Sequence, residues 1–122
     1  MIVVATSGVN QCLYCVVAHG AILRIYEKKP TLADQVAVNY RKADITPRQR
    51  AMLDFAIKVC EASSEVGDAD FAALAKHGFS HEDAWDIAAI TAFFGLSNRM
   101  ANTINMLPNE EFYLMGRVPK VK

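Results

Sequence analysis

Helix start and stop signals recur along this sequence and leave little room for other secondary structure. The strongest lies in "ITPRQRAML", where Thr46 is expected as N-cap and Pro47 as the first residue of a helix that runs to about Ala62. Ser80 and Asp83 form a capping-box pattern before a long apolar stretch. Alternating strand patterns are absent from the sequence. We therefore expect an all-α helical bundle.

Two further helices are predicted in the first third of the chain. Asn10 is expected to cap a helix from Gln11 to about Glu27, because asparagine is a favoured N-cap residue. Thr31 is expected to cap a shorter helix that ends at about Asn39.

The remaining segments have weaker patterns. Asp68 is expected to cap a short helix that Gly78 stops. The opening "MIVVATSG" is typical of the last turns of an apolar helix that ends at Gly8. The tail from Asn109, with Pro119 and a basic end, is expected to be extended.

Length and composition limit the classes of protein to consider. The 122 residues predict one domain, and 52% hydrophobic residues predict that some surface is buried against other subunits. With 13 basic and 13 acidic residues the net charge is zero, so no overall field favours nucleic acid or an anionic membrane. The apolar start "MIVVA" is too short to span a bilayer and lacks the basic flank of a signal peptide. We expect a cytoplasmic protein.

The stretch "NQCLYCVVAHG" is the main candidate for chemistry. On one helix Cys12, Cys15 and His19 fit within an arc of about 60°, so they face the same part of the core. Thiols near a helix start are favoured as thiolates by the helix dipole. A histidine one turn beyond Cys15 can exchange a proton with it. This pattern favours a thiol that attacks an electrophile and is then resolved by its neighbour as a disulfide.

Other interpretations of these residues stay open. The cysteines can be simple core residues, since cysteine is among the most buried types. A zinc site would need a fourth ligand from the list Cys60, His77 and His81. Covalent c-type haem is excluded because Val16, not histidine, follows Cys15. A thioredoxin-like fold is disfavoured because no strand precedes the motif.

Another pattern points to a different class of protein. "DIAAITAFFGLSNRMANTI" resembles a helix-turn-helix with Gly95 at the turn, but it also fits one continuous helix. The second segment offers Arg99 alone for phosphate contacts, so DNA binding is disfavoured. The aromatic residues of this stretch, Trp85, Phe93 and Phe94, are expected in the core or in a subunit interface.

A family resemblance rests on the paired cysteines and on the downstream blocks "ITPRQRAMLDFAIKV", "GFSHEDAWDIAAITAFFGLSNRMAN" and "PNEEFYLMGR". With these parts the sequence resembles the AhpD-like alkylhydroperoxidases of the carboxymuconolactone decarboxylase family, in particular peroxidase-related proteins. The resemblance implies an all-helical fold that assembles into trimers or hexamers and needs no metal or organic cofactor. It implies that Cys15 attacks the peroxide, that Cys12 resolves it, and that His19 belongs to a proton relay. Tyr14, between the cysteines, is expected near the pocket.

One relay group of the family is missing from this sequence. The family has a glutamate on the helix before the motif, a place that falls just before Met1, and residues 1–11 contain no acid. We expect residues 1–122 to form one AhpD-like domain without N-terminal helices that relatives possess. Either the natural start lies upstream, or the protein works without this carboxylate.

The resemblance predicts a peroxidase that reduces hydroperoxides with an external dithiol reductant, without a nucleic-acid or membrane partner. The alternatives are a general protein dithiol–disulfide oxidoreductase, or a non-catalytic, structural member of the family.

Overall fold

The computed structural model describes residues 1–118, and over this range it contains helices and no strand. The α-helices are α1 (Ile2–Val9), α2 (Leu13–Glu27), α3 (Leu32–Asn39), α4 (Pro47–Ala62), α5 (Asp68–Ala75), α6 (His81–Thr103) and α7 (Glu110–Leu114). Short 3-10 helices occupy Tyr40–Lys42 and Ser63–Glu65. The all-α prediction is confirmed, and Pro119 of the predicted tail lies outside the described residues.

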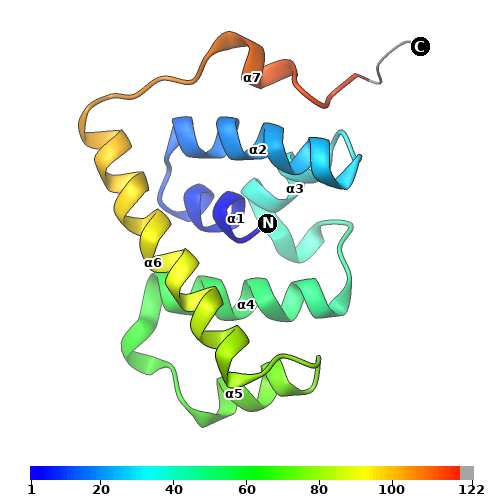
Figure 1. Cartoon of the computed structure of the whole chain (residues 1–122), viewed down its shortest axis with the longest axis vertical. Coiled ribbons are helices and arrows are strands. Elements are labelled where there is room, and N and C mark those ends of the chain that lie inside the picture. Colours follow the sequence, from blue (N-terminus) through cyan, green and yellow to red (C-terminus); the bar gives the residue numbers. More distant parts are fainter. Residues whose placement is uncertain (119–122) are drawn as a thin grey trace.

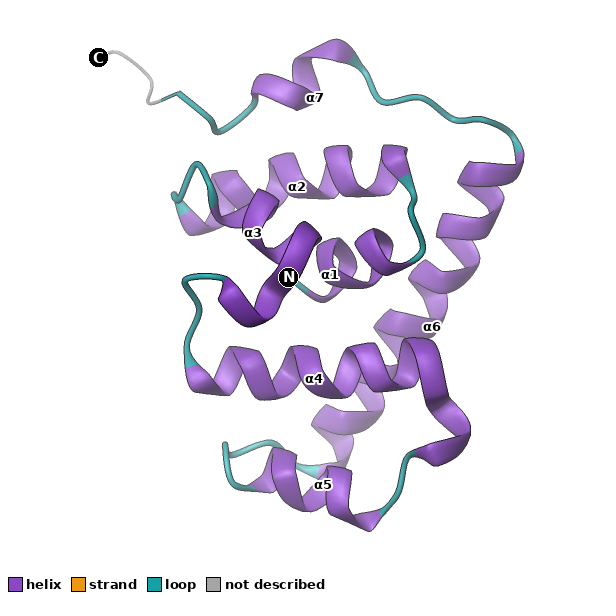
Figure 2. Cartoon of the chain, turned by 180° about the vertical axis from the view of Figure 1, so that it is seen from behind, coloured by secondary structure: helices purple, strands orange, loops and turns teal. Residues whose placement is uncertain are grey.

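Helix α1 lies at the centre and contacts α2, α3, α4 and α6. In Figure 1, α2 lies above α1 and α4 below it, α3 lies beside α1, and the long α6 crosses at the other side. Figure 2 shows from behind that α7 lies along α2 and is joined to α6 by an extended segment. Two of the helices around α1, namely α2 and α6, supply the candidate site.

The central position of α1 explains the apolar start of the sequence. Val4 is 1% exposed, and the side chains of Thr6 and Ser7 are completely buried. A helix of eight residues is marginal alone, so tertiary packing stabilises it. Gly8 permits the close approach of α3, because a Cβ at this position would overlap the carbonyl oxygen of Ala37. The helix ends at Val9, one residue beyond the predicted end.

The N-cap predicted at Thr46 and the capping box predicted at Ser80 are confirmed, and Thr46 also proves to be part of a capping box. Thr46 Oγ1 accepts a hydrogen bond from the Gln49 N–H at 3.1 Å, and the Gln49 side chain accepts one from the Thr46 N–H at 3.0 Å. At the start of α6, Ser80 Oγ accepts from the Asp83 N–H at 3.1 Å, and the Asp83 carboxylate accepts from the Ser80 N–H at 2.8 Å. Both helices therefore begin at the predicted residue.

Other boundaries differ from the predictions. Helix α5 is capped by Gly67 rather than by Asp68, because the Asp70 carboxylate accepts from the Gly67 N–H at 2.9 Å. The prediction of an extended tail from Asn109 was wrong, because residues 110–114 form α7. Thr31 occupies the predicted N-cap position of α3, although its side chain makes no capping hydrogen bond.

Helix α6 runs without interruption through Gly95, so the helix-turn-helix interpretation is wrong. Trp85 and Phe93 on this helix are 76% and 61% exposed, so neither belongs to the core of the single chain. Phe94 is partly buried against α2. Within residues 1–118, no helix combines the length and apolar character needed to cross a bilayer.

Candidate functional site

A tight turn between α1 and α2 places the first cysteine. Gln11 adopts a left-handed conformation with φ 52°, and the Cys12 N–H donates to the Ser7 carbonyl at 3.0 Å. Cys12 itself is extended, with φ −91° and ψ 102°, and is the N-cap of α2. Its Sγ accepts a hydrogen bond from the Cys15 N–H at 3.3 Å. The first sulfur thus lies at the positive end of α2.

The predicted cap of α2 was wrong by two residues. Asn10 ends α1 instead, and α2 begins at Leu13. The Asn10 side chain is engaged elsewhere, because its Nδ2 donates to Asn98 Oδ1 at 3.1 Å. The left-handed Gln11 separates the two helices, so Cys12 takes the capping position.

Both thiols of the motif are free and buried. Cys12 is 1% exposed and Cys15 is 4% exposed, and no disulfide joins them. Burial, together with the hydrogen bond to Cys12, raises the pKa of Cys15 to about 11. At pH 7 the Cys15 sulfur of the resting protein is therefore a thiol, and it needs a base before it can act as a nucleophile.

A buried amide on α6 lies next to this thiol. The Asn98 side chain is completely buried and donates through Nδ2 to Ser7 Oγ at 2.9 Å. A side-chain hydrogen bond from Asn98 favours the Cys15 thiolate and lowers the pKa that burial raises. Sequence reasoning missed Asn98, because a single asparagine on an apolar helix has no local signature of a site. Its position on the buried face, one turn before Ala101, was the available signal.

His19 lies one turn after Cys15 on α2, where residues four apart are neighbours. The ring of Phe94 contacts the imidazole edge-on, with centroids 5.0 Å apart. Burial lowers the pKa of His19, and the nearby Met1 ammonium lowers it further. The imidazole is therefore neutral at pH 7 and able to accept a proton.

A small apolar cavity opens beside His19. Its volume is about 230 Å³, and it lies between α2 and α7, lined by Tyr14, Ala18, His19, Ala21, Ile22, Ile25, Phe112 and Met115. Tyr14 also packs against the cluster of Cys12, Cys15 and Ala101. Tyr14 thus lines the cavity and contacts the cysteine cluster, in line with its expected position near a pocket.

The buried Arg24 holds the α7 wall of this cavity. Its Nε donates to the Met115 carbonyl at 2.8 Å, and its Nη2 donates to the Phe112 carbonyl at 2.8 Å. Arg117, just beyond α7, makes a two-pronged ion pair with Asp34 of α3. These contacts attach the end of the described chain to α2 and α3.

The third cysteine lies apart from the other two, on α4. Cys60 of α4 is only partly buried, and its thiol donates to Asn10 Oδ1 at 3.8 Å. Burial raises the pKa of this thiol. His81 is exposed, and its ring stacks on Phe71 with centroids 4.8 Å apart.

The possible zinc ligands do not gather in the structure. Over residues 1–118, no three His, Cys, Asp or Glu side chains come together to hold a metal ion. His77 lines a groove between α4 and α5 instead.

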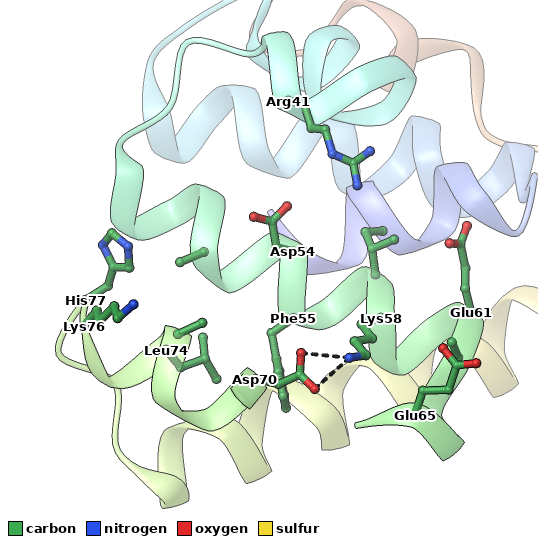
Figure 3. A pocket seen from close by; sticks show the side chains of 14 residues that line it. Arg41, Asp54, Phe55, Lys58, Glu61, Glu65, Asp70, Leu74, Lys76 and His77 are labelled. Carbon is green, nitrogen blue, oxygen red and sulfur yellow. Dashed lines mark hydrogen bonds and ion pairs between the residues drawn. The ribbon is translucent and has the colours of Figure 1, made fainter. Parts of the chain in front are cut away.

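That groove has a volume of about 710 Å³ (Figure 3), and neither Cys12 nor Cys15 lines it. Lys58 and Asp70 form an ion pair across it at 2.8 Å. The other charged residues in it are of both signs: Arg41, Asp54, Glu61, Glu65 and Lys76. Among the described residues no cysteine lines this groove, so it contains neither thiol of the predicted site.

Two solved structures resemble the chain in sequence and in fold. One is described as the alkylhydroperoxidase AhpD core of an uncharacterized peroxidase-related protein from Ralstonia eutropha JMP134, with 83% identity and a TM-score of 0.96 over 98% of this chain. The other is an uncharacterized peroxidase-related protein from Silicibacter sp. TM1040, with 46% identity and a TM-score of 0.92 over 95% of this chain. The chain spans 63% and 61% of the lengths of these two proteins. No protein-family model and no curated protein matches it.

Proposed function

The chain is AhpD-like in fold and sequence, and from this premise we propose that it is a thiol peroxidase that reduces alkyl hydroperoxides through Cys12 and Cys15. The observation that supports this most is the start of α2, where Cys12 caps the helix and accepts from the Cys15 N–H. The neutral His19 follows one turn later.

In the first step His19 takes the proton of Cys15, and the Cys15 thiolate attacks the outer oxygen of the hydroperoxide. A sulfur–oxygen bond forms while the oxygen–oxygen bond breaks, and the alkoxide leaves as an alcohol with the proton from His19. The sulfur is oxidised to a sulfenic acid, and the peroxide is reduced by the same two electrons. The lowered pKa of His19 leaves the imidazole unprotonated at pH 7 and therefore free to take the proton, and it makes the imidazolium a stronger acid towards the leaving alkoxide.

In the second step the Cys12 thiol condenses with the sulfenic acid of Cys15. A disulfide forms, and water leaves. An external dithiol then reduces this disulfide by exchange and is itself oxidised to a disulfide. The capping hydrogen bond to Cys12 Sγ stabilises that sulfur when it leaves as a thiolate.

The burial of both sulfurs favours a small substrate over a protein disulfide. At 1% and 4% exposure, neither sulfur is open to attack by a folded protein partner. The apolar cavity beside His19 suits the hydrocarbon part of an alkyl hydroperoxide. The general dithiol oxidoreductase therefore ranks below the peroxidase.

We also propose that the chain acts as a homo-oligomer, a trimer or hexamer. Large apolar side chains are exposed along α6 and the segment after it: Trp85, Phe93, Leu96, Met100, Ile104 and Leu107. Exposed apolar surface of this extent is typical of subunit interfaces. Light scattering coupled to size-exclusion chromatography measures the mass directly, and a monomer at micromolar concentration would contradict the proposal.

The proposed function is tested by the consumption of cumene hydroperoxide with excess dithiothreitol as reductant. We expect turnover by the natural chain and by Cys60→Ser, and none by Cys15→Ser. Consumption no faster than with dithiothreitol alone would refute the peroxidase and favour a non-catalytic family member. Turnover by Cys15→Ser equal to that of the natural chain would refute the assignment of the attacking thiol.

A further inference from the structure

The apolar cavity beside His19 owes its room to one small side chain of α2. A stripe of residues spaced by three or four positions shares one face of the helix and lines the cavity: Tyr14, Ala18, Ile22 and Ile25. Ala18 is the only small member of this stripe and lies between two large ones. A longer side chain at position 18 would therefore extend into the cavity.

The opposite wall, α7, is fixed close to α2 by backbone contacts. Gly116 has φ 76°, and a Cβ at this position would lie 2.8 Å from the Cβ of Arg24. The same arginine donates to the carbonyls of the two α7-side residues that line the cavity, Phe112 and Met115. The width of the cavity is therefore determined by how α7 is attached to α2.

The volume of the cavity limits the size of a ligand. An apolar cavity of about 150 Å³ is enough to hold benzene. At about 230 Å³, this cavity has room for an aromatic ring with a short branch, or for a compact alkyl group. The hydrocarbon of a long-chain fatty acid, which is several times larger than benzene, exceeds it.

The lining also determines the charge and the orientation of a ligand. Among the described residues that line the cavity there is no Asp, Glu, Lys or Arg, so a ligand carboxylate would lose water without gaining an opposite charge. The polar side chains are those of His19 and Tyr14, and Tyr14 packs against the two cysteines. Ile22 and Ile25, each 47% exposed, lie further along α2, towards solvent. The polar end of a ligand therefore belongs beside His19 and its hydrocarbon beside the two isoleucines.

We propose that Ala18 makes the site selective for compact, uncharged organic hydroperoxides, such as cumene hydroperoxide, over hydrogen peroxide and over fatty-acid hydroperoxides. Hydrogen peroxide has no hydrocarbon to bury, and a fatty-acid hydroperoxide is too large and carries a carboxylate. The selectivity among peroxides rests on the proposed peroxidase function, whereas the binding of a compact hydrocarbon group over Ala18 does not.

The test fills the cavity with Ala18→Leu in the full chain and measures binding and turnover. Binding is followed with 2-phenyl-2-propanol, the alcohol that cumene hydroperoxide yields, through the NMR shifts of the methyl groups of Ile22 and Ile25. We expect its Kd to rise by about tenfold or more, the usual effect of a misfit in an apolar pocket. With excess dithiothreitol, the ratio of kcat/KM for cumene hydroperoxide to kcat/KM for hydrogen peroxide should fall by a similar factor, mainly through KM.

Ala73→Leu is the matched control. Ala73 is an exposed alanine of α5 that lines the groove between α4 and α5, so the same three carbons are added away from the cavity. We expect its Kd and its kcat/KM ratio to match those of the natural chain. A folded Ala18→Leu protein with the Kd and the ratio of the natural chain would overturn the proposal.

A second variant covers the case in which Ala18→Leu does not fold. Ile22→Ala removes apolar wall from a half-exposed position, and we expect it to weaken alcohol binding by about fourfold, the effect of one buried methylene. An unchanged Kd in Ile22→Ala would also overturn the proposal. Alcohol binding that depends on these residues without any peroxide turnover refutes the peroxidase alone. Turnover of cumene hydroperoxide with no such dependence refutes the role of Ala18 alone.

Discussion

The Cys15 backbone N–H donates to Cys12 Sγ at 3.3 Å, so the first cysteine caps the helix that holds the second. The same sulfur therefore has a structural role in the reduced protein and a chemical role in the proposed cycle.

The capping role predicts how substitutions at Cys12 change stability. Serine can accept the same hydrogen bond, whereas alanine cannot, so Cys12→Ala is expected to be about 1 kcal/mol less stable than Cys12→Ser. Urea unfolding at pH 7 measures the difference. Thr31→Ala is the control, because Thr31 occupies an N-cap without a side-chain hydrogen bond and should change stability by a few tenths of a kcal/mol at most. Equal stability of the two Cys12 variants would show that the sulfur does not cap α2.

The raised pKa of Cys15 predicts a loss of stability at alkaline pH. The folded protein keeps this proton to a pKa of about 11, whereas the unfolded chain releases it near 9. The stabilisation is therefore fully present below pH 9 and is lost as the pH rises towards 11. The loss amounts to about 2–3 kcal/mol at one pKa unit per 1.36 kcal/mol. Urea unfolding from pH 8 to 11 should show a smaller decline in Cys15→Ser, and parallel declines would contradict the assignment.

His19 is predicted to determine the pH below which the peroxidase activity falls. Its lowered pKa keeps the imidazole neutral down to pH values below the usual histidine range, so peroxide consumption should fall only below about pH 6.5. His19→Gln should reduce the rate by about 10²–10⁴-fold through loss of proton transfer. His77→Gln, at the groove between α4 and α5, is the control and should be unaffected. Activity of His19→Gln within a factor of two of the natural chain would exclude this role.

Arg24 is predicted to hold α7 over the cavity beside His19. Arg24→Met removes the donors of both carbonyl contacts, so we expect amide exchange in residues 110–117 to accelerate while exchange in α4 stays unchanged. The expected loss of stability is about 1–3 kcal/mol. Asp34→Asn weakens only the exposed ion pair to Arg117 and should cost less than about 1 kcal/mol. Equal protection of α7 in Arg24→Met and the natural chain would contradict this role.

Local capping patterns explain why much of the fold could be predicted from the sequence. The boxes at Thr46 and Ser80 involve partners three residues away, so the pattern contains all the information needed to place both helix starts. The apolar periodicity around them was sufficient for the all-α class.

The errors arise where distant residues decide the structure. Asn10 is a good N-cap by type, but its side chain pairs with Asn98, which lies 88 residues away. Gln11 has no local signal for the left-handed conformation that shifts the helix start to Leu13. Helix α7 is five residues long and contacts α2 through Arg24, so its own sequence predicts little.

The candidate site was predictable only in part, for the same reason. The spacing of Cys12, Cys15 and His19 placed them on one face of a helix, and they do share α2 or its cap. Asn98 reaches Ser7 of α1, the helix before the motif, because α6 packs against α1, a relationship that no local pattern contains.

The most direct test of the central claim is the state of the thiols after one equivalent of cumene hydroperoxide, in Cys60→Ser without added reductant. We predict that both remaining thiols disappear together and that the intact mass falls by about 2 Da, as a Cys12–Cys15 disulfide requires. Retention of both thiols at unchanged mass would contradict it.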